Sequence, residues 1–255
     1  MLRRILKQFL YGSFYLIIFG AVGFGVYWGF LRAAPSCFDG VLNQNEEEID
    51  CGGVCEDCAL RRLVPLRVDP TQLFHAGEFG TTVFMQFRNS NNNYGASSFN
   101  YELNLYDTAG KVIFNQKEKS FIYPGEIKAL VLPALAVKFE DILRSDVKIS
   151  GTSWVKAGDF PRPEVIVKDV IFKTDGARAV VSGILVNKSP FLISKAIIGG
   201  IAVAKNGIYI NASLTSVADT AAFSEKPFQI FIPVLASDIP NLDPALVRTF
   251  VEAIR

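Results

Sequence analysis

The chain has 255 residues, half of them hydrophobic, and its 26 Lys and Arg against 25 Asp and Glu give a formal net charge of +1. This balance excludes the large basic excess expected of a nucleic-acid-binding protein, and the chain has no acidic tail of the kind that suggests disorder. The length leaves room for one membrane anchor and two modest domains.

The N-terminal segment predicts a membrane anchor. Residues 9–31, from Phe9 to Leu31, contain no charged side chain, and about 20 apolar residues are enough for a helix to cross the hydrocarbon core. Cations precede this run, so we expect residues 1–8 to form a basic cytoplasmic end and the rest of the chain to lie outside the cell membrane. A cleaved signal peptide fits less well, because its apolar core would span only roughly 7–15 residues.

Two glycines in the predicted anchor raise the question of whether the helix pairs with a second copy of itself. Gly25 and Gly29 form a small-xxx-small pair that would let two helices pack closely, so a homodimer through the helix is one alternative. The other is that glycine is common filler in membrane helices, and the sequence favours this simpler interpretation. The lipid bilayer is therefore the first expected partner.

All four cysteines fall in one short acidic segment. Cys37, Cys51, Cys55 and Cys58 lie within residues 33–60, which contain no Lys or Arg. Outside the membrane, cysteines at this density predict two disulfides that hold a loop with no core of its own. Three pairings are possible, and the spacing selects none of them. A structural zinc site is the weaker alternative, because it usually needs two C-x2-C arms and the segment has one.

Oxygen-bearing side chains recur between the first two cysteines. Asp39, Asn43, Glu46 and Asp50 are three or four residues apart, and carboxylate and amide oxygens are the ligands that calcium takes. Calcium is therefore a candidate ligand, and no other cofactor is expected. The alternative is a disulfide loop whose acidic side chains are only solvated.

The same stretch resembles a known cysteine-rich module. It matches the pattern C-x-D-G-x-x-N-x-x-E-x-x-x-D-C-G-G-x-C at every fixed position from Cys37 to Cys55. Modules of this kind stand beside membrane anchors and adhesive domains in extracytoplasmic proteins. The resemblance implies a surface-exposed, stapled loop and adds weight to calcium as a candidate ligand.

From Arg61 onward the sequence has the period of two that is typical of half-buried strands. In TTVFMQFRNS, for example, Val83, Met85 and Phe87 lie on one predicted face and Phe84 lies on the other. Turn residues separate the alternating runs at short intervals, which predicts an all-β fold.

The order of these runs repeats after about 97–100 residues. FRNSNN around Asn89 returns as LVNKSP around Asn187, and the hairpin LNLYDTAGKVIF corresponds to IAVAKNGIYI. The repeat predicts two tandem domains, residues 61–158 and 163–255, joined by a short proline-containing link. Each is about the size of an immunoglobulin-like β-sandwich.

The first of these domains resembles a bacterial family. Residues 103–107, LNLYD, are similar to the F-x-L-Y-D motif of extracytoplasmic sandwich domains related to the late-embryogenesis-abundant group, with Leu103 in place of the phenylalanine. The matching place in the second domain, residues 201–205, has lost the motif. The resemblance implies a sandwich fold, an extracytoplasmic location and a generally non-catalytic role.

Sequence patterns for catalysis are weak. A hydrolase triad needs a base, usually histidine, and the one histidine of the chain, His75, lies between two predicted strands. We therefore expect a non-enzymatic, structural or adhesive protein that presents tandem immunoglobulin-like domains, with other cell-envelope proteins as partners and no nucleic acid. The alternatives are a ligand- or calcium-binding sensor module at the cell surface and an enzyme of unknown class.

Overall fold

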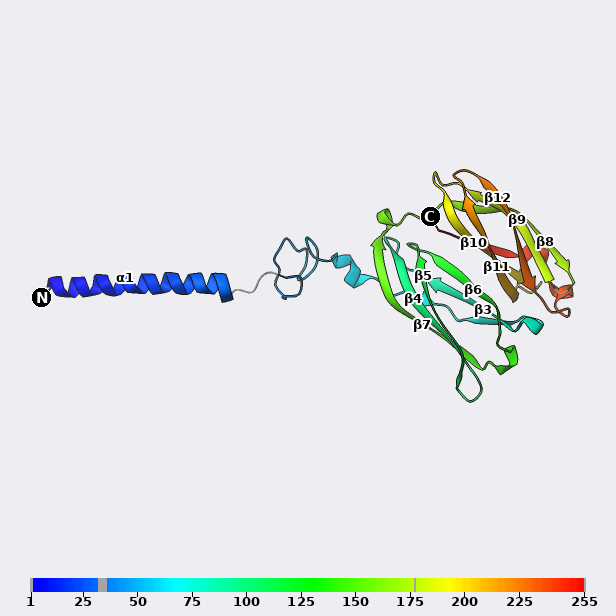
Figure 1. Cartoon of the computed structure of the whole chain (residues 1–255), viewed down its shortest axis with the longest axis horizontal. Helices are drawn as coiled ribbons and strands as arrows, with labels where there is room; N and C mark the ends of the chain where they lie inside the picture. The colour runs from blue at the N-terminus through cyan, green and yellow to red at the C-terminus, as the bar shows by residue number, and fades with distance from the viewer. Residues whose placement is uncertain (1, 32–35, 177, 255) are drawn as a thin grey trace. The chain divides into compact units, whose positions relative to one another are not determined.

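The computed structural model describes residues 2–31, 36–176 and 178–254 (Figure 1). The predicted start of the cysteine-rich module at residue 33 lies outside these residues, as do the predicted outer limits of the chain, residues 1 and 255. The chain divides into two compact units, Met1–Leu63 and Val64–Arg255, and each is described by itself.

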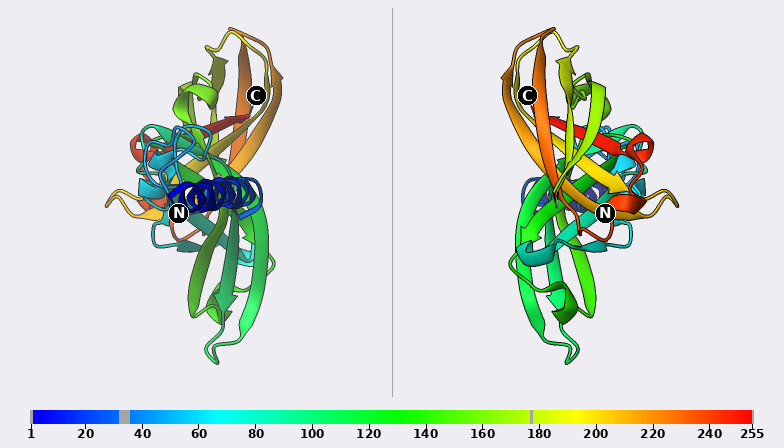
Figure 2. Two further views of the ribbon diagram at one scale, coloured as in Figure 1. Left: turned by 90° about the vertical axis from the view of Figure 1, so that its left-hand side faces the viewer. Right: turned by 90° about the vertical axis from the view of Figure 1, so that its right-hand side faces the viewer.

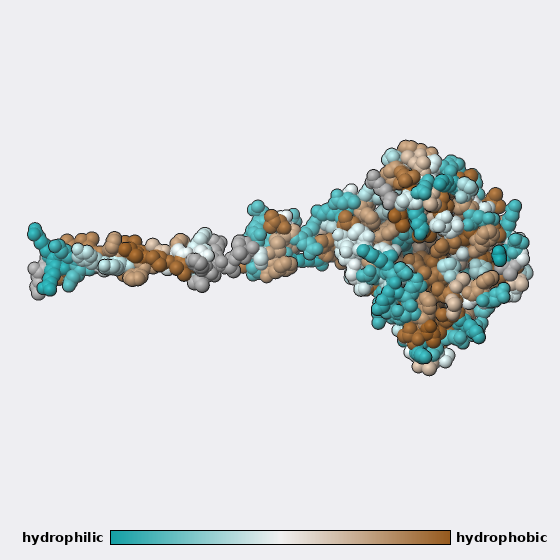
Figure 3. Space-filling model, in the orientation of Figure 1, coloured by the Kyte–Doolittle hydropathy of each residue, from teal (hydrophilic) through white to brown (hydrophobic). Residues whose placement is uncertain are grey.

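The first unit begins with one long apolar helix. Helix α1 (Leu2–Val26) continues as a π-helical turn (Tyr27–Leu31), so the predicted anchor from Phe9 to Leu31 is helical along its whole length. Residues Arg3–Gly29 are long and apolar enough to cross a membrane, and no other part of the described structure buries them. The helix surface is largely apolar, with hydrophilic residues at its N-terminal end (Figure 3). These are the properties of a membrane anchor or of a signal sequence.

The second unit contains the strands of the fold, and those before residue 160 form the first sandwich. They are β1 (Arg67–Val68), β2 (Gln72–His75), β3 (Thr81–Arg88), β4 (Tyr94–Tyr106), β5 (Val112–Ile122), β6 (Ile127–Leu135) and β7 (Arg144–Lys156). Strand β3 pairs with β1, β2 and β6 in one antiparallel sheet, and β4 pairs with β5 and β7 in the other. We call these the inner and the outer sheet of the first sandwich.

The strands after residue 160 form the second sandwich. They are β8 (Val165–Asp175), β9 (Arg178–Asn187), β10 (Ile193–Val203), β11 (Tyr209–Thr220), β12 (Glu225–Pro233) and β13 (Arg248–Ile254). Strand β10 pairs with β11 and β13 in an inner sheet, and β9 pairs with β8 and β12 in an outer sheet. The two groups of strands are separate in the ribbon views (Figures 1 and 2). The described chain is therefore all-β after one N-terminal helix, as the alternating pattern predicts.

The two sandwiches repeat the same local chemistry. Asn89, directly after β3, and Asn187, the last residue of β9, are both buried, and both side-chain amides donate hydrogen bonds to backbone carbonyls, with N–O distances of 2.7–3.1 Å. Each side-chain oxygen accepts from the backbone N–H two residues on, that of Asn91 or Ser189. The predicted correspondence of Asn89 and Asn187 is confirmed, because the two residues hold equivalent loops.

Each sandwich has its own core, and a third core joins the inner sheets. The first is built around Phe87, Phe99 and Leu103, and the second around Leu185 and Ile230. The third core contains side chains from both sandwiches: Phe74, Phe84, Val131, Ile201, Val203 and Ala212, with Tyr209, Leu214 and Phe250 packed against them. The inner sheets therefore lie face to face.

Packing of the inner sheets buries both faces of β3, although its alternating pattern predicted a half-buried strand. As predicted, Val83, Met85 and Phe87 face the first core. Phe84 on the opposite face is also buried, at 2% exposure, because the inner sheet of the second sandwich covers it. A period of two assigns side chains to faces, but it does not tell whether a second sheet packs on the outer one.

Candidate functional site

The cysteine segment is closed by two disulfides, as predicted. The bonds are Cys37–Cys55 and Cys51–Cys58, so the structure selects one of the three possible pairings, and no free cysteine is found among the described residues. Cys51 and Cys58 are buried, whereas much of the surrounding loop is exposed. Because the segment has little core, cross-links that reduce the freedom of its unfolded chain are the main source of its order.

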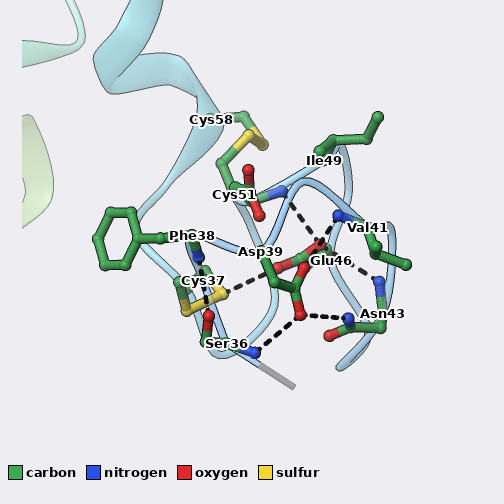
Figure 4. The surroundings of a disulfide bond; sticks show 12 residues. Ser36, Cys37, Phe38, Asp39, Val41, Asn43, Glu46, Ile49, Cys51 and Cys58 are labelled. Atoms are coloured by element: carbon green, nitrogen blue, oxygen red, sulfur yellow. Dashed lines mark hydrogen bonds between the residues drawn. A yellow bond between two sulfur atoms is a disulfide. The ribbon is translucent and has the colours of Figure 1, made fainter. Parts of the chain in front are cut away.

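Three of the four candidate calcium ligands, Asp39, Asn43 and Glu46, point toward one another within this loop (Figure 4). Asp39, Asn43, Glu46 and Asp50 are each partly buried, while their neighbours Glu47 and Glu48 are exposed. The first two are in direct contact, since Asn43 Nδ2 donates to Asp39 Oδ2 at 2.9 Å. The spacing of three or four residues therefore places these side chains on the inner side of the loop.

Backbone N–H groups occupy much of the acceptor capacity of the carboxylates. Asp39 accepts from Ser36 and Val41, Asp50 accepts from Gly40, and Glu46 Oε2 accepts from the N–H groups of Asn43 and Asp50. The hydrogen bond from the Asn43 side chain, and after it those from the Ser36 and Val41 N–H groups, lower the pKa of the Asp39 carboxyl. The acidic side chains thus stabilise the loop by bonding its turns.

Two glycines make the tight turn at the second cysteine. A Cβ atom at Gly52 would lie 2.7 Å from the Glu47 side chain, and one at Gly53 would lie 2.2 Å from the Asn45 carbonyl oxygen. Both glycines have positive φ, at 80° and 60°, which other residues adopt at a cost. The C-G-G element of the sequence pattern is therefore explained by space and backbone geometry.

Among the described His, Cys, Asp and Glu side chains, the three predicted carboxylate ligands do not form one compact metal-binding cluster. The groups whose ligand atoms lie within 4.8 Å of one another are Cys37, Glu46 and Cys55, and Glu48, Cys51 and Cys58, and both contain disulfide sulfurs. The Oε1 atom of Glu46 lies 3.2 Å from Cys55 Sγ, a contact and not a hydrogen bond, because a disulfide sulfur carries no proton. Calcium binding stays a prediction.

A basic pair follows the acidic segment and bonds back to it. Arg61 donates to the backbone carbonyls of Ile49 and Asp50, and Arg62 pairs with Glu48. Both arginines lie in a short 3-10 helix, Cys58–Arg62, whose N-cap is Asp57. The contacts of the cysteine-rich module therefore extend beyond residue 60.

Sequence reasoning missed a buried charged site where the two sandwiches meet. Lys128 on β6 is 3% exposed, and its ammonium group pairs with Glu252 on β13 at 2.7 Å. The same group donates to the Phe121 carbonyl at 2.7 Å and lies 3.8 Å from the centre of the Phe121 ring. Burial lowers the pKa of Lys128, and Glu252 opposes that shift. The only signal in the sequence is a lysine inside the otherwise apolar run IKALVLP.

A second ion pair lies beside it. Glu126 is buried at 8% exposure, accepts from the Tyr123 N–H at 2.8 Å and pairs with Arg162 at 3.1 Å. The Tyr123 ring stacks on Phe160, with centroids 4.6 Å apart, and its hydroxyl donates to the Ala253 carbonyl of β13. The segment between the sandwiches is therefore held against the first one.

The histidine is held in a turn. His75 ends β2, its Nδ1 atom accepts from the Gly77 N–H at 3.2 Å, and its Nε2 atom lies 2.9 Å from Glu140 Oε1. A catalytic triad needs an acid on one histidine nitrogen and a nucleophile on the other, and here the nitrogen opposite Glu140 accepts from a backbone N–H group instead of contacting a nucleophile. The contacts connect two loops of the first sandwich.

No family model and no curated protein matches the chain. Among solved structures, it is similar to the crystal structure of red sea bream transglutaminase, with 10% sequence identity and a TM-score of 0.23. The match covers 76% of this chain and 30% of that chain, so this chain spans less than a third of the other protein. A similarity at this level carries no argument about fold or activity.

Proposed function

We propose that the chain is a single-pass membrane protein that presents a rigid pair of β-sandwiches on the extracytoplasmic side, in a structural, adhesive or envelope-assembly role. The observation that carries the proposal is the shared core between the inner sheets, with Phe84 and Ile201 buried in it. Two domains joined in this way move as one body, which suits a protein that sets the position of a binding surface.

The first unit supports the same proposal. The cations at the start of the chain favour a cytoplasmic N-terminus, and disulfides persist in an oxidising compartment outside the cytoplasm. The resemblance of the cysteine segment and of residues 103–107 to extracytoplasmic modules points the same way. Other cell-envelope proteins are the partners that this location offers.

Topology is tested by adding a protease to intact cells that carry the protein with a tag after its C-terminus. The sandwiches should be degraded or released under conditions that leave a cytoplasmic control intact. A tag that stays protected while known surface proteins are digested would contradict the proposal. Cross-linking of intact cells followed by purification through the tag then identifies the partner.

Rigidity is tested separately with spin labels on noncanonical residues at Ala109 and Asn206, two exposed hairpin positions, one in each sandwich. A narrow distance distribution is expected from pulsed electron paramagnetic resonance. A broad one would show that the sandwiches move independently and would remove the basis for the display role.

A calcium-responsive module is the second candidate. Asn43 Oδ1 is buried and has no hydrogen-bond partner among the described residues, so it has an acceptor site free for a cation. Calorimetric titration of the protein with calcium should show binding that Asp39→Asn weakens and that magnesium does not reproduce. Equal heats for wild type and variant would leave the loop a purely structural element.

A further inference from the structure

A pocket of about 360 Å³ opens where the two sandwiches meet. It is bordered by β5 and β6 of the first sandwich and by β10, β11 and β13 of the second, and it lies at the free edges of β5 and β6. This volume falls in the range of small-molecule sites, roughly 300–1,000 Å³. The site is distinct from the cysteine-rich module and from the surface role proposed above.

The walls of the pocket are apolar. Leu130 and Leu132 line the pocket and also pack against the first core. Leu214 and Phe250 line it as well and pack against the shared core. The pocket is therefore the place where both cores can be reached from the surface. An apolar molecule bound there would cover hydrocarbon of both sandwiches at once.

The polar side chains that line the pocket include a tyrosine hydroxyl and two carboxylates, together with those of Gln116, Lys119 and Ser120. Tyr101 and Glu118 are register partners on β4 and β5, so both side chains lie on the face of the outer sheet that points into the sandwich. Glu252 borders the pocket from β13 and is already paired with Lys128. Lys119 also borders the mouth, but its register partner is Asn100, which places its side chain on the opposite face.

Glu118 is the carboxylate without a cation. Among the described residues its polar contact is Gln116 Nε2 at 3.4 Å, and it forms no ion pair. Since Lys128 offsets the charge of Glu252 and the register places Lys119 on the opposite face, Glu118 is the inward-facing charge of the pocket that has no counter-ion among the described residues. The negative charges also act on the neighbouring tyrosine. Burial, and after it the charges of Glu118 and Glu252, raise the pKa of Tyr101 to about 12.

We propose that this pocket binds a small, largely apolar molecule with a single ammonium group. The apolar body lies against Leu130, Leu214 and Phe250, and the ammonium group pairs with Glu118 at the mouth. A carboxylic acid of the same shape would meet a like charge there and an alcohol would leave Glu118 uncompensated, so the head group decides the affinity.

The test compares three probes that share one apolar body: 4-phenylbutylamine, 4-phenylbutanol and 4-phenylbutyrate. Each is titrated calorimetrically into the full-length protein in lipid nanodiscs, with empty nanodiscs as the blank. The variants are Glu118→Gln and, as a matched control, Glu102→Gln. Glu102 is a carboxylate on the neighbouring strand β4 whose side chain lies on the opposite face of the same sheet, beside Lys117.

The amine should bind more tightly than the alcohol, and the acid most weakly. Glu118→Gln should weaken amine binding by about fivefold, the effect of losing one partly exposed ion pair, and should leave the alcohol unchanged. Glu102→Gln should change neither. Equal binding of amine and alcohol, an unchanged amine affinity in Glu118→Gln, or no binding of any probe would each overturn the proposal.

Discussion

The ion pair between Lys128 and Glu252 should be worth far more than a surface pair. Its two side chains are 3% and 17% exposed, and it connects β6 of one sandwich to β13 of the other. Removing one partner of a buried pair leaves a charge that has lost both water and its counter-ion, which costs about 3–5 kcal/mol in well-buried cases. The cost depends on which charge is left behind.

We expect Glu252→Met to lower the free energy of unfolding by about 3 kcal/mol, because it strands the better-buried ammonium group. Lys128→Met should cost about 2 kcal/mol, since Glu252 keeps some access to water while the Phe121 carbonyl loses a donor. The double variant should cost about 2 kcal/mol, which leaves a coupling free energy of about 3 kcal/mol.

The assay is urea unfolding of the full-length protein in nanodiscs, followed by the fluorescence of Trp154, which packs against the first core. Trp28 in the N-terminal helical segment is replaced by Phe in every variant to remove its background. The exposed pair Glu102–Lys117 is the control, and its coupling should be under about 0.5 kcal/mol. A coupling below about 1 kcal/mol for Lys128 and Glu252 would refute the reasoning, because it would mean that the sandwiches do not enclose this pair.

Three further changes test other parts of the fold. A Cβ atom at Gly199 would lie 1.8 Å from the ring of Phe250, its register partner on β13, so Gly199→Ala should lower the free energy of unfolding by about 2–3 kcal/mol. Gly158→Ala, with open space around it, should change that free energy by no more than about 0.5 kcal/mol. Equal urea midpoints for the two variants would argue against the position of the Phe250 ring over Gly199. Asn187→Ala removes a buried side-chain amide that donates to three backbone carbonyls and should cost about 3 kcal/mol in the same assay, and a cost near zero would contradict its role. The pKa of Tyr101 is raised to about 12 in the folded protein, above its ordinary value of 10.0, so the associated stability is fully present below pH 10 and is lost as the pH rises through about 12. The pKa of Tyr123 is also raised to about 12, so ultraviolet titration of tyrosinate should show a late step from two residues, and Tyr101→Phe should lower its amplitude by about half.

Local patterns were enough for much of the architecture. A run without charges predicts the N-terminal helix, alternation predicts the strands and the faces of Val83 and Met85, and the repeat predicts that Asn187 does what Asn89 does. These features depend on neighbours in the chain or on spacing, which a single sequence displays. The acidic side chains of the cysteine segment were predicted only as candidate calcium ligands, and their bonds to backbone N–H groups were not foreseen.

The tertiary structure decided which cysteines pair, that the outward face of β3 is buried, and that Lys128 meets Glu252 from 124 residues away. Alternation shows which side chains share a face, but it contains no information about the second sheet that covers that face. A buried charge and a pocket between two domains exist only once distant strands are brought together. That is why the sequence was enough to predict an all-β fold after one helix but not the site where the sandwiches meet.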